Sequence, residues 1–498
     1  MTNRNIDNVD IIIMQTTRTK KKTRQASANS NGRHQAKLGN VPISLTRAGR
    51  ENGSKLQSRK QDSDLQKTED VSPASELFRR DDWMEFRDPN RISNKAGVAF
   101  EQLPKVVAKE LCDDALDAAG AAEFGLLEVT SDAVTFFVAD SGPGLGGTDE
   151  EIAELYSVRR ALTSSKMVRL PTRGMLGNGL RAVAGVVLVS EGRLRVSTRG
   201  RTLTLEPRAE NGWTAIVAVE PWEGAGTRVE VTLRGPLARH ARSENDGGLF
   251  GWAEEACRLT GGKQYKGKSS SHWYDPPGFW ELCQAAGDIR VGTFLERNLD
   301  GCSDKAAVVA GELIERNCGT LTRDEADAML GRAKSATRLV APERLGKVGR
   351  RDDYFGYGCE TGQFDAHGAK VPFVVEAWVN RADRPGGTIC VNCTPVCAKV
   401  DVRRYEGSDY AVFGCQLNRR FAAGRKDAGE FHVLINVITP HVPLTSSGKD
   451  PDLSPMVEQI AAALEKAVRV AKRTAPKTGG TRRSQKSIIR ARIEAAAA

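Results

Sequence analysis

Three short segments in the first half of the chain constrain its fold more than any other feature. They are ELCDDALDA at residues 110–118, DSGPGLG at residues 140–146 and RGMLGNGL at residues 173–180. In order, they supply an acidic helix face, an aspartate followed by a glycine-rich turn, and a glycine-rich loop before a helix. A pocket that binds and hydrolyses a nucleotide needs these three features, so the series predicts such a pocket in an α/β domain.

The first segment lies in VVAKELCDDALDAA at residues 106–119, which contains neither Gly nor Pro. Its apolar residues recur every three or four positions, which predicts an amphipathic helix. Glu110, Asp114 and Asp117 then project to nearly one side of the helix, with Asp113 beside them. Because like charges this close repel one another, a divalent cation and a water molecule that needs a base would stabilise the group. For an isolated helix, the alternative is a solvated acidic face.

An apolar, β-branched and aromatic run at residues 133–139 ends in Asp140 and a Gly-Pro-Gly turn. This pattern predicts a strand that delivers a carboxylate to the edge of a sheet. A buried aspartate there can accept a hydrogen bond from an exocyclic amine such as that of adenine. Taken alone, Asp-Ser-Gly is more often a turn in which the carboxylate accepts a hydrogen bond from its own backbone.

The third segment places Gly174, Gly177 and Gly179 directly before an apolar helix that we expect to begin at Leu180. Free backbone N–H groups and the helix dipole at such a place suit phosphate oxygens. The spacing matches neither the P-loop nor the Rossmann fingerprint. The glycine loop alone is therefore weak evidence for phosphate binding, and it becomes strong evidence only after the two segments that precede it.

Together, the three segments resemble the Bergerat (GHKL) ATPase fold of type II topoisomerases, MutL repair proteins, the large heat-shock chaperone and histidine kinases. The resemblance implies that Glu110 is the general base, that Asp114 is the Mg²⁺ ligand and that Asp140 binds the adenine amine of ATP. It also implies cofactor-binding roles for turn, lid and last-strand residues: Gly142, Gly144, Lys166, Gly174, Met175, Leu176, Gly177, Asn178, Gly179, Leu180 and Thr227. Asp114 and Ser141 stand where that family usually has Asn. The extra carboxylate can still hold Mg²⁺ but adds negative charge beside a triphosphate, which bears on turnover more than on binding.

The second half of the chain carries a strand–loop–helix pattern. Residues 373–379 and 388–400 are predicted strands, and residues 431–449 are a predicted strand that runs into a loop. Residues 455–473 are predicted to form an amphipathic helix with a regular apolar stripe. The loop VPLTSSGKDPDLSP lies between the last strand and the helix. This arrangement is similar to the transducer domain of topoisomerases and MutL, and the likeness implies that Lys449 reaches the γ-phosphate of ATP. An exposed turn lysine is the alternative.

Within the transducer-bearing families, the chain most resembles the B subunit of the type IIB enzymes, the topoisomerase VI group. SELFRRDDWMEFRDPNRI, TSSKMVRLPTRGMLGNGL, PFVVEAWV and SSGKDPDLSPMVEQIAAAL carry this resemblance. It implies a Bergerat ATPase domain at residues 75–235, a helix-two-turns-helix-like insert at 236–350 and an S5-like transducer at 351–473, with basic tails at 1–74 and 474–498. It further implies ATP-dependent homodimerisation that closes a clamp on DNA, and a separate DNA-cleaving A subunit in an A2B2 assembly.

Two other classes of ATPase remain open at this point. One is a MutL-like repair ATPase, and the other is a non-topoisomerase ATP switch, such as an accessory or phage-defence protein on the same module. A histidine kinase is excluded because no His precedes the acidic helix at a suitable position for phosphate transfer.

Composition agrees with an ATPase that works on DNA in a reducing compartment. The 498 residues include 10 Cys without regular spacing and no apolar run near the ~20 needed to cross a bilayer. We therefore expect no membrane association, and a cytoplasmic, nucleoid-associated place in a prokaryote or a nuclear one in a eukaryote. Cys390, Cys393 and Cys397 lie close enough in the sequence for a zinc site, but the pattern favours buried core thiols. Residues 1–70 carry 14 Lys and Arg against 7 Asp and Glu, and residues 469–498 carry 9 against 1, so both ends could contact phosphate backbones.

Overall fold

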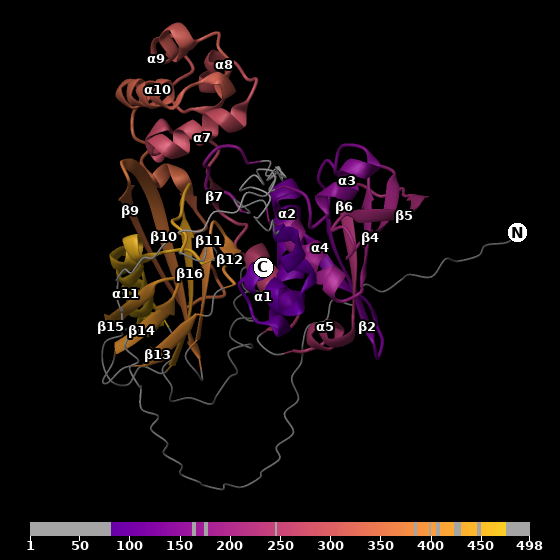
Figure 1. Ribbon diagram of the computed structural model, residues 1–498. Coiled ribbons are helices and arrows are strands. Elements are labelled where there is room, and N and C mark those ends of the chain that lie inside the picture. The colour runs from indigo at the N-terminus through magenta and orange to yellow at the C-terminus, as the bar shows by residue number, and fades with distance from the viewer. Residues whose placement is uncertain are drawn as a thin grey trace, which may run out of the picture. The chain divides into compact units, whose positions relative to one another are not determined.

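The computed structural model describes residues 81–161, 166–173, 178–244, 247–382, 386–397, 400–404, 409–422, 430–445 and 450–474. The predicted N-terminal tail, almost all of the C-terminal tail, the four lid residues 174–177 and Lys449 lie outside these ranges. The described chain has the mixed α/β architecture that the sequence predicts (Figure 1).

The first sheet has six antiparallel strands in the order β1-β2-β6-β3-β4-β5. Its strands are β1 Glu123–Val129, β2 Ala133–Asp140, β3 Arg193–Thr198, β4 Arg201–Pro207, β5 Thr214–Pro221 and β6 Thr227–Arg234. The helices around it are α1 Pro89–Ala96, α2 Leu103–Ala119, α3 Asp149–Leu155, α4 Gly179–Val189, α5 Gly235–Ala241 and α6 Gly251–Arg258. Figure 1 shows α2 and α4 on one face of this sheet.

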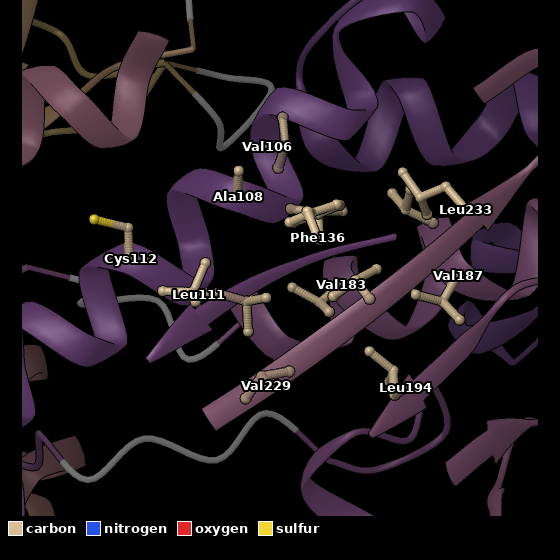
Figure 2. Close-up of a cluster of buried hydrophobic side chains, with 14 of the residues drawn as sticks. Val106, Ala108, Leu111, Cys112, Phe136, Val183, Val187, Leu194, Val229 and Leu233 are labelled. Carbon is tan, nitrogen blue, oxygen red and sulfur yellow. The ribbon is translucent and has the colours of Figure 1, made fainter. Parts of the chain in front are cut away.

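Because side chains alternate between the two faces of a strand, only one face of this sheet is buried against helices. Along β2, Val134, Phe136 and Val138 are buried and the residues between them are partly exposed. The buried side chains pack against apolar residues of α2 and α4, such as Leu111 and Val183 (Figure 2). The other face carries ion pairs, Arg195–Glu230 and Arg228–Glu230, beside the partly exposed Phe137 ring. The amphipathic α2 is therefore fixed on the sheet with its acidic side turned away from the core.

The central part of the chain is mainly helical and has its own core. It contains α7 Pro276–Ala286, α8 Val291–Asn298, α9 Ala306–Ala310 and α10 Arg323–Ala336. The predicted insert begins at residue 236, whereas the buried side chains of α5 and α6 belong to the core of the first sheet. The buried residues of the separate helical core begin at Trp273. The reason is spatial: α6 packs against α2, which no local pattern reveals.

The second large sheet has five strands in the order β12-β11-β16-β10-β9. Its strands are β9 Gly356–Ala366, β10 Ala369–Ala382, β11 Gly386–Val391, β12 Thr394–Pro395 and β16 Glu430–Ile438. Helix α11, Val457–Thr474, covers β9 and β10 (Figure 1). The helix approaches so closely that a Cβ on Gly356 or Gly358 would lie 2.0 Å from a backbone oxygen of α11. Glycine at these two positions is therefore a packing requirement.

One predicted strand is wrong in detail. Residues 388–400 were expected to form a single strand, but their described part, residues 388–397, contains a hairpin in which β11 and β12 are joined by Asn392 and Cys393. Both residues have positive φ, 51° and 65°, the backbone form of a tight two-residue turn. The sequence TICVNCTPV does not predict that turn, because the β-branched residues on both sides of Asn392 favour a continuous strand.

The remaining elements are short. They are β7 Lys263–Gln264, β8 Gly346–Lys347, β13 Asp401–Arg404, β14 Asp409–Gly414, β15 Leu417–Ala422, and the 3₁₀ helices η2 Asp82–Arg87, η3 Phe100–Gln102, η5 Ser271–Trp273, η6 Gly311–Leu313, η7 Cys318–Thr320, η8 Pro342–Leu345 and η9 Ser454–Met456. None of the helices in the described ranges is long and apolar enough to cross a membrane.

Candidate active site

Helix α2 is the axis of the candidate site. It has Pro104 in its first turn, no helix breaker in its interior, and Gly120 in the left-handed conformation just after its end. This geometry places Glu110 in the middle of the helix and Ala118 in its last turn. The two positions are about 12 Å apart along the axis. That span suits an extended nucleotide, with the base at one end and the terminal phosphate at the other.

At the Glu110 end, the helix meets the start of α4. A Cβ placed on Gly179, the first residue of α4, would lie 2.5 Å from Oε2 of Glu110. The acid predicted as general base and the first helical residue after the glycine loop are therefore in direct contact. The φ of Gly179 is not positive, so a side chain here would cause no backbone strain but would displace the Glu110 carboxylate. Leu180, another predicted lid residue, packs its side chain against the core of the first sheet.

At the Ala118 end, the helix meets the turn that follows β2. The Gly142 N–H donates a hydrogen bond of 2.7 Å to Oδ1 of Asp140. A Cβ on Gly142 would lie 3.0 Å from the backbone oxygen of Ala118. Asp140 therefore does form the turn with its own backbone that the sequence left open as an alternative. That bond uses one carboxylate oxygen, and the turn holds the carboxyl against the last turn of α2.

A threonine that the sequence analysis missed supports this turn. The Thr198 hydroxyl accepts a hydrogen bond of 2.8 Å from the Leu145 N–H and donates one of 3.3 Å to the Gly226 oxygen. The space around it is full, since a Cβ on Gly144 would lie 2.8 Å from the same hydroxyl oxygen. Thr227, which was predicted, is buried and pairs with both Asp140 and Thr198 across the sheet. A threonine at the end of one strand among many has no local signal of such a role.

Asp114 lies between the two ends and is electrostatically crowded. Desolvation by the surrounding protein and the charges of Glu110, Asp113 and Asp117 raise the pKa of Asp114 to about 7. Because Asp114 is an exposed residue, solvent screens these charges and reduces their effect on stability. Burial raises the pKa of the Tyr156 hydroxyl, and the carboxylates of Asp114 and Asp140 raise it further. Both carboxyl groups therefore lie near the same buried side chain.

The donor set around Asp114 suits a divalent cation bound together with phosphates. A cation would relieve the repulsion that raises the pKa of Asp114, and carboxylate oxygen is a ligand that Mg²⁺ prefers. Beside the start of α4, the buried Oδ1 of Asn178 has no hydrogen-bond partner among the described residues. Across the described residues, no group of three or more His, Cys, Asp and Glu side chains is arranged to hold a metal alone. Any Mg²⁺ here would need oxygens from its substrate.

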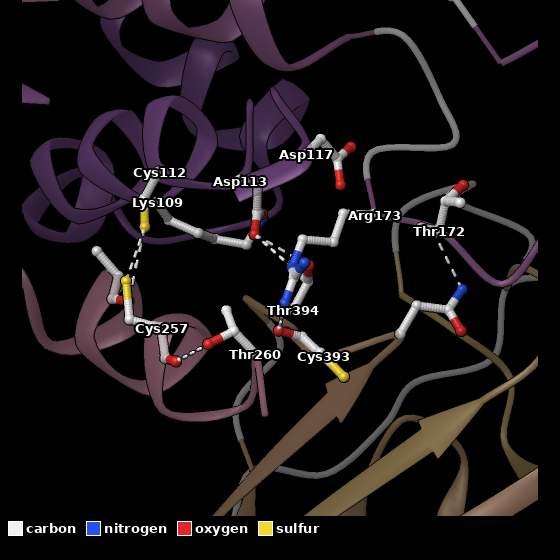
Figure 3. Close-up of polar contacts among 12 residues, drawn as sticks. Lys109, Cys112, Asp113, Asp117, Thr172, Arg173, Cys257, Thr260, Cys393 and Thr394 are labelled. Atoms are coloured by element: carbon white, nitrogen blue, oxygen red, sulfur yellow. Dashed lines mark hydrogen bonds and ion pairs between the residues drawn. The ribbon is translucent and has the colours of Figure 1, made fainter. Parts of the chain in front are cut away.

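Behind Glu110 lies a buried network of charged side chains that the sequence pattern does not predict. Lys109 is almost fully buried, and its ammonium lies 2.9 Å from Oε1 of Glu110. The same ammonium lies 3.0 Å from Oδ2 of Asp113 (Figure 3). Burial alone would lower the pKa of Lys109, but the two carboxylates raise it well above its ordinary value. The ammonium therefore stays charged and fixes one oxygen of Glu110. A lysine and two acids on one helix look like a solvated face in the sequence, and only burial shows otherwise.

The predicted residue Lys166 also contacts α2. Its ammonium pairs with the Asp117 carboxylate and donates to the backbone oxygen of Arg173. Lys166 thus binds the helix and the chain that leads into the glycine loop at once. The loop residues Gly174, Met175, Leu176 and Gly177 themselves lie outside the described ranges.

The C-terminal part of the chain also comes close to Glu110. The pKa of the Cys397 thiol is raised to about 11, chiefly by burial. The carboxylates of Glu110 and Asp450 both contribute to that rise, so both lie near the thiol. Asp450 directly follows Lys449 in the chain. A cavity of about 1120 Å³ adjoins this point and is lined by Lys105, Cys397 and Asp450, but not by Asp114 or Asp140.

No protein-family model matches the sequence, and a search of curated proteins finds no match either. Among solved structures, the chain is similar to the ATPase region of topoisomerase II from Saccharomyces cerevisiae, with 9% identity and a TM-score of 0.32 over 80% of this chain and 86% of that one. It is similar also to the ATPase and transducer domains of DNA topoisomerase II from Balamuthia mandrillaris, with 10% identity and a TM-score of 0.33 over the same shares. The yeast region bound to ICRF-187 (dexrazoxane) aligns over 70% of this chain and 76% of that one, with 9% identity and a TM-score of 0.29. These values describe a distant likeness.

Proposed function

We propose that this chain binds ATP together with Mg²⁺ along α2, hydrolyses it, and serves as the ATPase subunit of a topoisomerase VI-like, type IIB DNA topoisomerase. The observation that carries the ATPase proposal is the convergence on one helix of Glu110 with Gly179 and of the Asp140 turn with Ala118. These contacts join segments that the sequence resemblance selected separately. The subunit role rests on that resemblance.

In this proposal, the adenine lies at the Asp140 turn and the phosphates lie at the start of α4. Asp140 accepts a hydrogen bond from the exocyclic amine, while Gly142 and Gly144 keep its turn free of side chains that would fill the space. Backbone N–H groups at the start of α4 face the phosphate oxygens, where the helix dipole favours negative charge. Thr227 supports the strand that carries Asp140.

Glu110 is then the base that takes a proton from the attacking water. The water oxygen bonds to the γ-phosphorus as the bond to the ADP oxygen breaks, and the water proton moves to a Glu110 oxygen. Lys109 holds Oε1, so we assign the proton to Oε2, the oxygen that faces Gly179. When bound, Mg²⁺ would neutralise charge on the phosphates, with Asp114 as its protein ligand.

The remaining parts of the cycle are also proposed. Lys449 would contact the γ-phosphate, as the resemblance of its loop to that of a transducer domain implies. Two chains would dimerise through their ATPase domains with ATP bound, close around DNA, and reopen after hydrolysis. A separate A subunit would cleave the DNA in an A2B2 assembly, with α11 and the following tail as its docking place.

Single-turnover hydrolysis and equilibrium binding of ATP test the ATPase assignment. Glu110→Ala should keep ATP affinity and lose turnover by about 10²-fold or more, because it removes only the base. Asp140→Asn should lose affinity first. Glu128→Gln is the matched control, since Glu128 is an exposed carboxylate on the edge strand β1. Unchanged turnover in Glu110→Ala would end the assignment of the base.

A non-hydrolysing ATP switch is the second candidate, and one observation favours it. Asp114 replaces the neutral Asn of the resembling family and crowds the site with carboxylates that raise its own pKa to about 7. Such a site can bind ATP with Mg²⁺ and still align the water poorly. Binding by the wild-type chain without any single turnover would select this candidate. Relaxation of supercoiled DNA with a co-expressed A-type subunit would instead support the topoisomerase.

A further inference from the structure

The eight residues before the glycine loop, residues 166–173, contact three parts of the chain. Lys166 pairs with Asp117 of α2. The Arg169 guanidinium lies 4.8 Å from the ring centroid of Tyr274, beside the helical core. The Thr172 oxygen accepts a hydrogen bond of 3.2 Å from the Asn392 side chain, in the hairpin of the second sheet. The start of the glycine loop is therefore tied to both the helical core and the second sheet.

Arg173 and Asp113 form the buried centre of these contacts. Their side chains are 8% and 4% exposed, and Nε of Arg173 lies 3.6 Å from Oδ1 of Asp113. The hairpin supplies one further partner to each of these two side chains (Figure 3). The Thr394 hydroxyl donates a hydrogen bond of 3.0 Å to the same Asp113 oxygen, and Nη2 of Arg173 donates one of 3.4 Å to the Cys393 oxygen.

The hairpin is itself held in a fixed position. The Cys393 N–H donates to the side chain of Asn436, which is fully buried in β16. The Asn392 side chain accepts a bond of 2.9 Å from the Thr439 N–H. Since a tight turn with both of its residues bonded to a core strand has little freedom, the Thr394 hydroxyl and the Cys393 oxygen are presented as a rigid pair.

From this hairpin, a continuous chain of polar contacts leads to Glu110. Thr394 contacts Asp113, Asp113 contacts Lys109, and Lys109 contacts Glu110. Each link is 3.0 Å or shorter. The carboxylate that we propose as base is thus oriented by groups that reach back to a sheet far away in the sequence.

We propose that the hairpin at residues 392–394 sets the position of Glu110, with Asp113 as the positioning residue through which it acts. ATP turnover then depends on the contact between the hairpin and α2, while ATP affinity does not. This inference rests on the proposed function, because it assigns a control to the same site. Its consequence is that a shift of the second sheet would change the rate of hydrolysis without changing the bound nucleotide.

The test uses the full chain and measures kcat, KM for ATP and thermal unfolding for a set of hairpin variants. Thr394→Val keeps the shape but removes the hydrogen bond to a buried carboxylate, so kcat should fall about five- to tenfold with KM within about twofold. Thr394→Ser keeps a hydroxyl and should restore the rate. Thr361→Val is the matched control, because the Thr361 hydroxyl also donates to a carboxylate, that of Glu343, at a distant exposed place.

A double-mutant cycle decides whether the contacts act as one unit. Asp113→Asn combined with Thr394→Val should lose no more rate than Asp113→Asn alone. Losses that multiply, or a Thr394→Val rate within twofold of wild type, would overturn the inference. If Asp113→Asn unfolds at the assay temperature, the test depends on the difference in kcat between Thr394→Val and Thr394→Ser. Absence of turnover in the wild-type chain would overturn the proposed hydrolysis itself, and this inference with it.

Discussion

The two ends of the site along α2 are built in different ways. At the Asp140 end, a carboxylate, its own turn and neighbouring strands of one sheet make the contacts, and most of the groups are neutral. At the Glu110 end, buried charges of α2 and of the loop approach make them, together with a hydroxyl and a backbone oxygen of the second sheet, across as many as 281 positions of sequence. In the proposed site, a local turn would hold the nucleotide base by itself. The carboxylate proposed as base is oriented instead by a network that joins distant parts of the chain.

The largest effect should come from breaking the charged network. Lys109→Met leaves the buried Asp113 without its ammonium partner, and breaking such a pair costs about 3 kcal/mol or more of unfolding free energy. Lys370→Met removes an exposed pair with Asp365 and should change the unfolding free energy little. Urea unfolding of both variants gives the comparison. Equal effects would mean that the Glu110 end is not held by buried charge.

The next largest effect separates stability from activity. Gly179→Ala places a methyl group 2.5 Å from Oε2 of Glu110, so turnover should fall about 10²-fold as the carboxylate moves. The same change favours the helix by up to ~1 kcal/mol, so thermal stability should not drop in parallel. Gly331→Ala in α10 meets no atom within 4 Å and should raise stability alone. Similar turnover in the two alanine variants would show that Gly179 does not touch the working carboxylate.

A smaller effect is expected at the Asp140 end. Thr198→Val removes the acceptor of the Leu145 N–H and loosens the turn, which should weaken ATP binding about fivefold. The rate of the bound complex should stay within about twofold of wild type. Thr198→Ser should recover the affinity. A Thr198→Val variant that loses hydrolysis rate but keeps its ATP affinity would show that the Asp140 end and the Glu110 end do not act separately.

The smallest effect concerns Asp114 and depends on pH. The folded-state pKa of Asp114 is raised to about 7, above the unfolded value of about 4. The folded chain therefore binds more protons than the unfolded chain between these values, so this residue lowers the unfolding free energy as pH rises through that window. Asp114→Asn should raise the melting temperature by roughly 1–2 °C at pH 8 and less at pH 5. Differential scanning calorimetry of Asp114→Asn at pH 5 and pH 8 measures this rise in melting temperature. A larger rise at pH 5 than at pH 8 would contradict the repulsion between Asp114 and its neighbouring carboxylates.

Local patterns predicted the elements of the site well. The periodicity of residues 106–119 indicated a helix, and α2 extends over Leu103–Ala119. The apolar run that ends in Asp140 is β2, and the helix expected from Leu180 is α4, which begins one residue earlier. These features depend on neighbours three or four positions apart, or on alternation along one strand. Such spacing is fixed by backbone geometry, so the sequence alone reveals it.

Other features depended on the tertiary structure. The hairpin at Asn392 and Cys393 replaced a predicted single strand, and Thr198 and Arg173 had no local signal of their roles. Nothing in the sequence near Asp113 indicates that it contacts Thr394, since the pairing exists only once two sheets are packed. The sequence determined which side chains share a face of α2. Tertiary packing decided which of them are buried and paired, because desolvation depends on all the atoms that surround a charge and not on its neighbours in the chain.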